Sequence, residues 1–539
     1  MVPVTPPWRP PRPAPGGDAW GGAAGGAGRD AASGASTEGA STIGAAQTIA
    51  APPGRPSRRR DRRERLLRAS RASVSIVALV TVVVLAAGVG LIGSAAQPAY
   101  GDGAPWGGTT VDDTRSQPVE AAWRLDLAKL LSPDAPPRCL HFWPSAAADG
   151  LVAVSSSVDL DFGSAAEAPE CRQFALANTS SRVALIDTTT GHVRWVHDIA
   201  ADVAGADPLS IPSSQVVPAV SRVLVQTQAT GSTVLVALDL DDGHVVETTR
   251  GRRDLPSVSV DTRGRLQLRT YTGAGDSGDG FALVDAADLG TPVWQGQVDV
   301  GTTPLLIDGG LLTVQHDRVV RVDGSTGAEH PFAAHPDSIA VPPGDTGLVY
   351  ALDRTRDGRR TVSALAPDGT ARWTSTTTTS ARSIAVTRRC VVATASDQDE
   401  AVCLDPSTGA ARWTADLHAP FSATALPGQT SDDVFVLTRG TDSAVLVCLD
   451  GASGTERFRT PIGALDEAVA ASRTVVYVGT EDSRSYPRGI TAIDAVTGAG
   501  LWSVQSGDTV SYWGGRLVQI DDRGIARHLA AGDRAVTTP

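Results

Sequence analysis

Lysine is almost absent from this chain of 539 residues. Lys129 is the only one, and arginine supplies every other basic side chain outside the histidines. Together with the many alanines and glycines, this bias is typical of a high-GC genome, as in actinobacteria, and carries no information about mechanism. Aromatic residues are also scarce, at 5% of the chain, but a hydrophobic content of 41% still allows a sizeable core. The length leaves room for a large folded unit with extensions.

Sites for cofactors and metals are also missing from the sequence. The five cysteines are never adjacent, which excludes a dense disulfide scaffold, and no C-x-x-C-H haem motif occurs. The nine histidines do not cluster at ligand spacing. Residues 239–243, DLDDG, begin like a calcium loop, but its twelfth position is Arg250 rather than glutamate. We therefore expect no cofactor, no metal and no catalytic residue.

One long apolar stretch, residues 74–96, divides the chain. Its 23 residues carry no charge. As a helix they would extend roughly 35 Å, enough to cross a hydrocarbon core of about 30 Å. The preceding residues 58–73 hold eight arginines and two acidic residues, and the positive-inside rule keeps such a flank in the cytoplasm. The sequence predicts an uncleaved membrane anchor with the C-terminal part outside the cytoplasm; cleavage near Ala96, as in a signal peptide, is the alternative.

The remaining segments differ in composition and charge. Residues 1–57 are rich in proline, glycine, alanine and serine and are predicted to form a disordered cytoplasmic tail. Residues 97–118 are predicted to be a linker, and residues 119–530 the folded domain. Residues 1–71 hold twelve arginines and five acidic residues, whereas the whole chain has a net charge of −12. The folded domain is therefore acidic, which argues against a nucleic-acid partner because phosphate contacts need a basic face.

A short pattern returns along the folded domain. In residues 401–413, AVCLDPSTGAARW, an apolar strand leads to an aspartate, a glycine follows four residues later, and a tryptophan four residues after that. Aligned glycines recur at spacings of 37 to 52 residues, at Gly191, Gly243, Gly290, Gly327, Gly369, Gly409, Gly454 and Gly498. The pattern is complete in Asp187, Gly191 and Trp195, in Asp405, Gly409 and Trp413, and in Asp494, Gly498 and Trp502. Glu247 and Pro331 stand where an aromatic residue is expected.

Each member of the pattern has a local role. The aspartate can accept hydrogen bonds from nearby backbone N–H groups in an Asx-type turn. The glycine supplies the positive φ of the reversal. The aromatic residue opens the next strand, where it can pack against a neighbouring sheet. About four short strands fit into each period, which is typical of a β-propeller blade.

The pattern [AV]-[LI]-D-x-x-T-G-x-x-x-W resembles the pyrroloquinoline-quinone-type (PQQ-type) propeller repeat. This repeat occurs in quinoprotein dehydrogenases and in the propeller lipoprotein of the outer-membrane assembly machinery. The resemblance covers residues 119–530 and implies an all-β propeller fold. It does not decide the function, because both enzymes and binding scaffolds use the repeat.

The two ends of the domain are predicted to meet. Residues 119–128, VEAAWRLDLA, look like an outer strand without a blade, and residues 509–529 look like inner strands without an outer one. Their pairing would close the ring and remove its sheet edges. Counting outer strands gives nine, whereas the resemblance implies seven or eight blades. We expect eight.

Four of the cysteines are candidates for disulfides if the propeller lies outside the cytoplasm. Cys139 and Cys171 both lie in the irregular first blade. Cys390 and Cys403 lie on consecutive predicted strands, and a two-residue turn at residues 396–397 would place them opposite each other. Burial as small hydrophobic residues is the alternative for this pair, and it is the role expected for Cys448.

Three functions remain open at this point. The expected one is a non-enzymatic binding scaffold in the cell envelope, anchored in the cytoplasmic membrane through residues 74–96, with an envelope protein or peptide as its partner. The second is a quinone-dependent dehydrogenase. Such enzymes hold the quinone with adjacent cysteines, a tryptophan floor, Ca²⁺ and a catalytic aspartate, and no adjacent cysteines are present. The third is a receptor for a small molecule or a cell-wall glycan.

Overall fold

The computed structural model describes residues 101–530 apart from connecting segments, of which the longest are 159–170, 172–181 and 271–278. The described residues form nine four-stranded antiparallel sheets, so the predicted all-β class is confirmed. None of the helices among them is long and apolar enough to span a membrane. The predicted anchor, residues 74–96, and the predicted tail lie outside the described residues.

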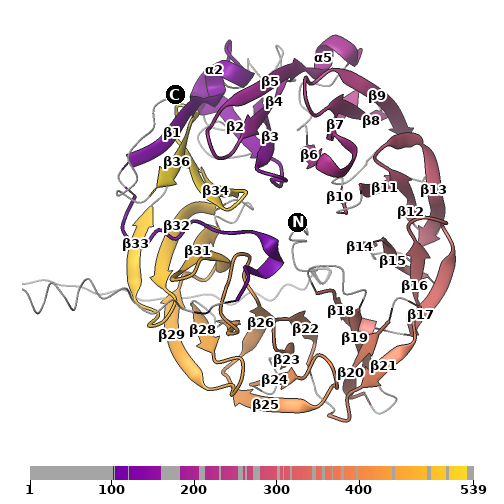
Figure 1. Ribbon diagram of the computed structural model, residues 1–539, viewed down its shortest axis with the longest axis vertical. Helices are drawn as coiled ribbons and strands as arrows, with labels where there is room; N and C mark the ends of the chain where they lie inside the picture. The colour runs from indigo at the N-terminus through magenta and orange to yellow at the C-terminus, as the bar shows by residue number, and fades with distance from the viewer. Residues whose placement is uncertain are drawn as a thin grey trace, which may run out of the picture. The chain divides into compact units, whose positions relative to one another are not determined.

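Figure 1 shows the sheets following one another around a ring in chain order. The first four sheets consist of β2 (Leu140–Pro144), β3 (Leu151–Val158), β4 (Arg182–Asp187) and β5 (Val193–Asp198); β6 (Ser213–Val217), β7 (Arg222–Ala229), β8 (Ser232–Asp239) and β9 (Val245–Arg252); β10 (Ser259–Val260), β11 (Arg265–Thr270), β12 (Asp279–Asp285) and β13 (Asp288–Val298); and β14 (Leu305–Ile307), β15 (Gly310–Gln315), β16 (Arg318–Asp323) and β17 (Glu329–Ala334).

The next four sheets repeat this order from the inner to the outer strand. They consist of β18 (Pro336–Ala340), β19 (Val349–Arg354), β20 (Arg360–Leu365) and β21 (Ala371–Thr374); β22 (Ser383–Val386), β23 (Val391–Ala395), β24 (Glu400–Leu404) and β25 (Ala411–Asp416); β26 (Pro420–Thr424), β27 (Val434–Arg439), β28 (Ala444–Leu449) and β29 (Glu456–Ile462); and β30 (Asp466–Ala471), β31 (Val475–Glu481), β32 (Pro487–Asp494) and β33 (Gly500–Val504).

The ninth sheet joins the two ends of the domain. It contains β34 (Thr509–Trp513), β35 (Arg516–Ile520), β36 (Ile525–Ala530) and, as its outer strand, β1 (Glu120–Asp126). Strands β1 and β36 are antiparallel, with Glu120 opposite Ala530 and Asp126 opposite Ile525. The predicted closure by the N-terminal strand is therefore confirmed. The short helices are η1 (Trp106–Gly108), α2 (Leu127–Leu131), η2 (Pro137–Cys139), α5 (Ile199–Asp202) and η3 (Pro218–Val220).

The position of a strand within its sheet explains its sequence. The third strand β8, STVLVALD, has six consecutive buried residues because neighbouring sheets cover both of its faces. The outer strand β5, VRWVHD, fully buries only Trp195. An apolar run is therefore expected for inner strands, and a single buried aromatic residue is enough for an outer strand.

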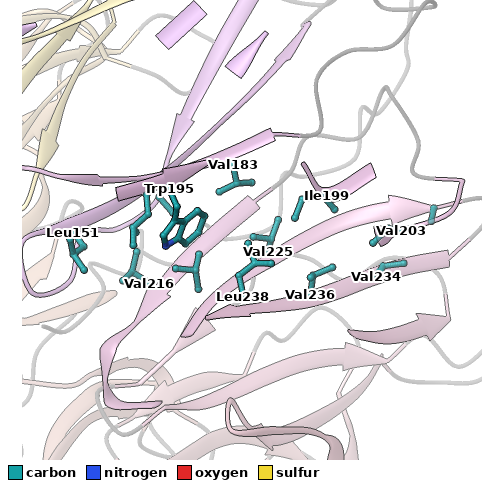
Figure 2. Packing of buried hydrophobic residues seen from close by; sticks show 14 residues of the cluster. Leu151, Val183, Trp195, Ile199, Val203, Val216, Val225, Val234, Val236 and Leu238 are labelled. Carbon is teal, nitrogen blue, oxygen red and sulfur yellow. The ribbon is translucent and has the colours of Figure 1, made fainter. Parts of the chain in front are cut away.

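Nine clusters of buried hydrophobic residues hold the sheets together, and each lies between two successive sheets. Figure 2 shows the cluster in which Trp195 and Val183 of one sheet pack against Val225 and Leu238 of the next. With nine sheets and nine interfaces among the described residues, the expected count of eight blades is one too low. The nine outer strands counted in the sequence agree with the nine sheets of the structure.

Candidate functional site

The repeated aspartates act as acceptors within their own turns. Oδ1 of Asp187 accepts the N–H groups of Thr189 at 2.9 Å and Thr190 at 3.0 Å. Asp405 and Asp494 accept the equivalent pair of bonds. Burial raises the pKa of Asp187, but the N–H donors of Thr190 and Thr189 outweigh it and hold the pKa below its usual value. These carboxylates are thus ionised and engaged in the turn.

The repeated aromatic residues connect each sheet to the turn of the next. The ring of Trp413 lies so close to Gly454 that a Cβ there would be 2.6 Å from it. Its Nε1 donates to the carbonyl of Gly451 at 3.1 Å. Trp195 donates in the same way to Leu240 at 3.1 Å. Equivalent bonds join Trp123 to Thr188 and Trp373 to Pro406. The glycine is required here both for its positive φ and because nothing larger fits against the ring.

At the two positions where the repeat lacks its aromatic residue, another side chain contacts the next sheet. The turn predicted at Gly290 is wrong. The carboxylate of Glu247 accepts the N–H of Leu289 in the next sheet at 3.1 and 3.2 Å. Phe332 lies one residue later than the pattern predicts, is buried, and packs against Gly369. Gly290 lies inside β13 and does not have the positive φ predicted for it, because the turn before β13 ends at Ala287, three residues earlier.

Residues 101–118, which we call the N-terminal strap, are fastened to one face of the propeller. The sequence predicts a linker here. In the structure the N–H of Trp106 donates to Gln429 at 2.8 Å, and that of Asp112 donates to Gly515 at 2.9 Å. The side chain of Asp113 accepts the hydroxyl of Ser472 at 2.6 Å. The strap therefore crosses the last sheets of the ring before it enters β1.

The side chain of Asp112 contacts two basic residues of the ninth sheet. Its two carboxylate oxygens meet Nη1 of Arg516 at 2.6 Å and Nε2 of His528 at 2.7 Å. His528 is 5% exposed, so this contact lies inside the fold. Burial raises the pKa of Asp112, but the hydrogen bond from His528 and the charge of Arg516 outweigh burial and lower it.

The strap also replaces a turn that the ninth sheet lacks. The last tryptophan of the repeat, Trp502, needs a carbonyl from the turn before the next outer strand. That outer strand is β1, so the chain has no continuous turn at this point. The carbonyl of Thr114 takes its place and accepts the indole N–H of Trp502 at 2.8 Å. The hydroxyl of Tyr477 accepts the N–H of Thr114 at 2.9 Å and donates to the carbonyl of Asp112 at 2.6 Å.

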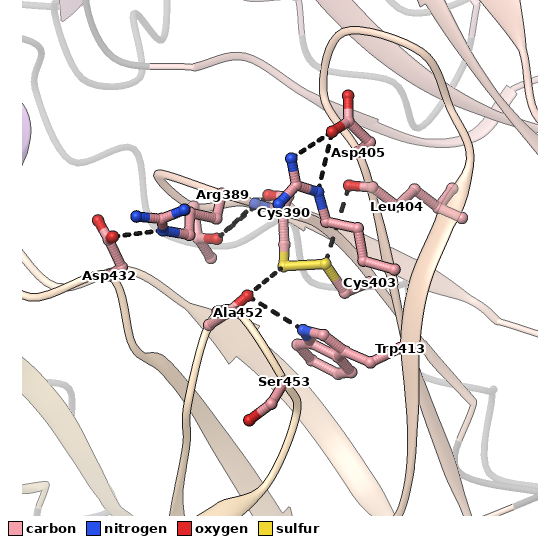
Figure 3. Close-up of a disulfide and its surroundings, with 12 residues drawn as sticks. Arg389, Cys390, Cys403, Leu404, Asp405, Trp413, Asp432, Ala452 and Ser453 are labelled. Atoms are coloured by element: carbon pink, nitrogen blue, oxygen red, sulfur yellow. Dashed lines mark hydrogen bonds and ion pairs between the residues drawn. A yellow bond between two sulfur atoms is a disulfide. The ribbon is translucent and has the colours of Figure 1, made fainter.

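The four candidate cysteines are joined in the two pairs that the sequence analysis proposes. One disulfide links Cys139 to Cys171, and the other links Cys390 to Cys403 (Figure 3). The register differs from the predicted one, because Cys403 lies opposite Val392. Residues 396–397, proposed as the turn, lie outside the described residues. The second disulfide lies in the same hydrophobic cluster as Trp413 and ties the residue just before β23 to β24 in one sheet.

Counting free thiols tests this pairing. In denaturant without reductant, alkylation of the purified propeller is expected to modify one cysteine, Cys448, because the other four are oxidised. After reduction all five cysteines should react. Intact-protein and peptide mass spectrometry would identify the sites. Three or five reactive thiols before reduction would show that one or both disulfides are absent.

Cys448 lies in a buried polar contact and not in a reactive site. Burial raises the pKa of its thiol, so the thiol stays protonated and is a poor nucleophile. The neighbouring Asp433 is 2% exposed, and burial raises its pKa to about 6 although Arg457 opposes the shift. Oδ1 of Asp433 and Nε of Arg457 are 3.0 Å apart. The group connects the inner part of its sheet to the outer strand.

One group of side chains among the described residues has a geometry compatible with a metal ion. It consists of Asp239, Asp242 and His244, which are half-buried or exposed. Asp239 belongs to the repeat turn and accepts the N–H of Asp241 at 2.8 Å. Asp242 contacts the ring of His244 at 2.6 Å and, through this hydrogen bond, raises the pKa of His244. The turn itself accounts for these contacts.

The repeat residues do not converge on one centre. Trp195, Trp413 and Trp502 belong to three different interfaces between sheets. Each set of aspartate, glycine and aromatic residue completes a local turn and one contact with a neighbouring sheet. The structure thus gives these residues an architectural role, and the strap is the structural segment that the sequence did not predict.

Comparison with known proteins agrees with this architecture. Residues 358–443 and 425–532 match a family model described as "Outer membrane protein assembly factor BamB". Residues 358–532 thus carry the PQQ-type β-propeller repeat. No curated protein sequence matches it. The matched residues cover the last sheets of the propeller.

The solved structures that match the chain include proteins of different kinds. BamB from Moraxella catarrhalis is 16% identical, with a TM-score of 0.39 over 59% of this chain and 97% of that chain. Apo AztD from Citrobacter koseri is 12% identical, with a TM-score of 0.35 over 61% and 92%. Quinohemoprotein alcohol dehydrogenase from Comamonas testosteroni is also 12% identical, with a TM-score of 0.35 over 83% and 82%.

Proposed function

We propose that this PQQ-type propeller is a non-enzymatic binding scaffold of the cell envelope, anchored in the cytoplasmic membrane and exposed on its outer side. The observation that carries the proposal is the match of residues 358–532 to the family model of an outer-membrane protein assembly factor. By this likeness, the partner is another envelope protein or a peptide. The turn aspartates and aromatic residues that give the family its pattern are bonded within the fold.

Two features support the location outside the cytoplasm. Disulfides persist in oxidising compartments, and the structure holds two of them. The uncharged residues 74–96 follow an arginine-rich flank, which favours a cytoplasmic N-terminus. The acidic charge of the folded domain suits a soluble domain that does not bind nucleic acid.

Proteolysis of intact cells tests the topology. After removal of the cell wall, added protease is expected to digest residues beyond about 100 and to leave the N-terminal tail protected, because the positive-inside rule places the tail in the cytoplasm. Antibodies against tags at the two ends would report each part, and cells permeabilised with detergent are the control. Protection of the propeller together with digestion of the tail would reverse the proposed orientation.

Cross-linking in the native membrane tests the scaffold role. Full-length tagged protein should capture a defined envelope protein, and an excess of purified residues 101–539 should compete with that capture. Recovery of glycan without protein would favour a receptor role. Capture that the purified propeller does not reduce would show that the propeller is not the binding part.

A further inference from the structure

The two faces of the propeller are defined by which turns they carry. In each four-stranded antiparallel sheet, the turn between the first and second strands and the turn between the third and fourth strands lie at the same end. We call this end the turn face. The turn between the second and third strands and the connection to the next sheet lie at the other end, the opposite face. The repeat turns around Asp405 and Asp494 therefore belong to the turn face.

The strap contacts three connections of the turn face. Gln429 and Thr430 lie between β26 and β27, Ser472 and Thr474 between β30 and β31, and Gly515 between β34 and β35. All three connections join a first strand to a second strand. The strap forms hydrogen bonds with each of these connections. Its backbone N–H groups donate to the first and the third, and the side chain of Asp113 accepts from the second. Side-chain contacts continue on the same face, where Arg115 bonds to Asp494 at 2.5 Å.

The strap is attached from its first described residue onward. A Cβ on Gly101 would be 2.6 Å from the carbonyl oxygen of Thr430, so Gly101 already lies against the turn face. The N–H of Gly103 donates to the same carbonyl at 3.2 Å. Nη2 of Arg388 donates to Gln429 at 2.8 Å, and its guanidinium lies 5.9 Å from the centre of the Trp106 ring.

This attachment shortens the connection to the proposed anchor. From Ala96 to Gly101 the chain has five peptide links, which reach at most roughly 18 Å at ~3.5 Å per residue. A free linker of residues 97–118 would reach about 75 Å by the same measure. We propose that the strap holds the turn face of the propeller next to the lipid headgroups. This inference rests on the membrane anchor of the proposed function and adds to it a fixed orientation.

The orientation assigns different partners to the two faces. The turn face presents Trp106 beside Arg388, and tryptophan is enriched at membrane–water interfaces. The opposite face points away from the lipid. It carries two of the exposed large hydrophobic residues, Phe421 at 52% and Leu465 at 48%, at the starts of inner strands. A protein partner would therefore approach from the side that is remote from the membrane.

A matched pair of labels within one sheet tests the orientation. Ala452 lies in the turn after β28 and Ser443 lies just before β28, so the two exposed sites are separated by that strand, roughly 20 Å at ~3.4 Å per residue. Full-length protein with Cys448→Ser, carrying either Ala452→Cys or Ser443→Cys and a donor dye, would be placed in phosphatidylcholine and phosphatidylglycerol vesicles with an acceptor lipid. Energy transfer from position 452 is expected to exceed that from position 443 about twofold or more because of this separation.

A longer tether is the control. Insertion of about twenty Gly/Ser residues after Pro98 keeps the strap bound but frees the propeller, so the difference between the two positions should disappear. Equal transfer from both positions without the insertion, or stronger transfer from position 443, would overturn the orientation and leave the anchor intact. Transfer from neither position, with the protein failing to float with the vesicles, would remove the anchor and this inference together.

Discussion

Replacing Trp413 with alanine is expected to lower the free energy of unfolding of the purified propeller by about 3–5 kcal/mol, the range for a buried large aromatic residue. Trp413 is 8% exposed and fills the space between its own sheet and the turn of the next. Its removal leaves a cavity beside Gly454. It also removes the hydrogen bond that the indole N–H donates to the carbonyl of Gly451. Chemical denaturation followed by tryptophan fluorescence and circular dichroism would measure the change.

Two variants separate packing from hydrogen bonding at this site. Trp413→Phe keeps most of the ring and removes the N–H group, so it should cost less than the alanine variant. Phe421→Ala removes an exposed ring, 52% exposed in the folded protein, and is the matched control for loss of an aromatic residue. Its effect should stay within about 1 kcal/mol. An unfolding midpoint of Trp413→Ala equal to that of the unsubstituted protein would contradict the architectural role of the repeat aromatics.

Replacing Asp112 with alanine is expected to destabilise the propeller by about 1–3 kcal/mol, as when a partly buried, hydrogen-bonded carboxylate is removed and its partners are left unpaired. Arg516 and His528 would lose their common acceptor, and His528 would stay buried. The change should also loosen the strap, which supplies the carbonyl bound by Trp502. Hydrogen exchange at Thr114 and Tyr477, together with the unfolding midpoint, would report both effects.

Two comparisons make this result specific. Asp112→Asn keeps an acceptor oxygen for one of the two partners and should lose less stability than Asp112→Ala. Asp522→Ala removes an exposed aspartate from the turn between β35 and β36 and should change stability by less than about 0.5 kcal/mol. Equal effects of Asp112→Ala and Asp522→Ala would show that the strap is a passive linker.

The repeat could be predicted from the sequence because its physical causes are local. An aspartate that accepts N–H groups two and three residues ahead, and a glycine with positive φ, leave a fixed spacing in the chain. The exceptions could not be predicted because they depend on neighbouring sheets. Glu247 replaces an aromatic residue by binding the backbone of Leu289, more than forty residues away in the chain.

The strap and the number of sheets needed the three-dimensional structure. Residues 101–118 contain no periodic apolar pattern, and their contacts are single bonds to residues such as Ser472 and Arg516, several hundred positions away. No local signal marks such a segment. The count of nine could be read from the outer strands, including the one around Trp123, but the usual size of the family favoured a smaller number. In this case direct counting agreed with the structure.

The central claim is that the family pattern serves the architecture of a scaffold and not the binding of a quinone. Titration of the purified propeller, residues 101–539, with pyrroloquinoline quinone and Ca²⁺ tests it most directly, with turnover assayed by an artificial electron acceptor and alcohols or sugars as substrates. Asp405, Gly409 and Trp413 are engaged in turn and interface contacts. The account therefore predicts no saturable binding and no reduction of the acceptor. Quinone binding in the micromolar range together with turnover would contradict it and establish an enzyme.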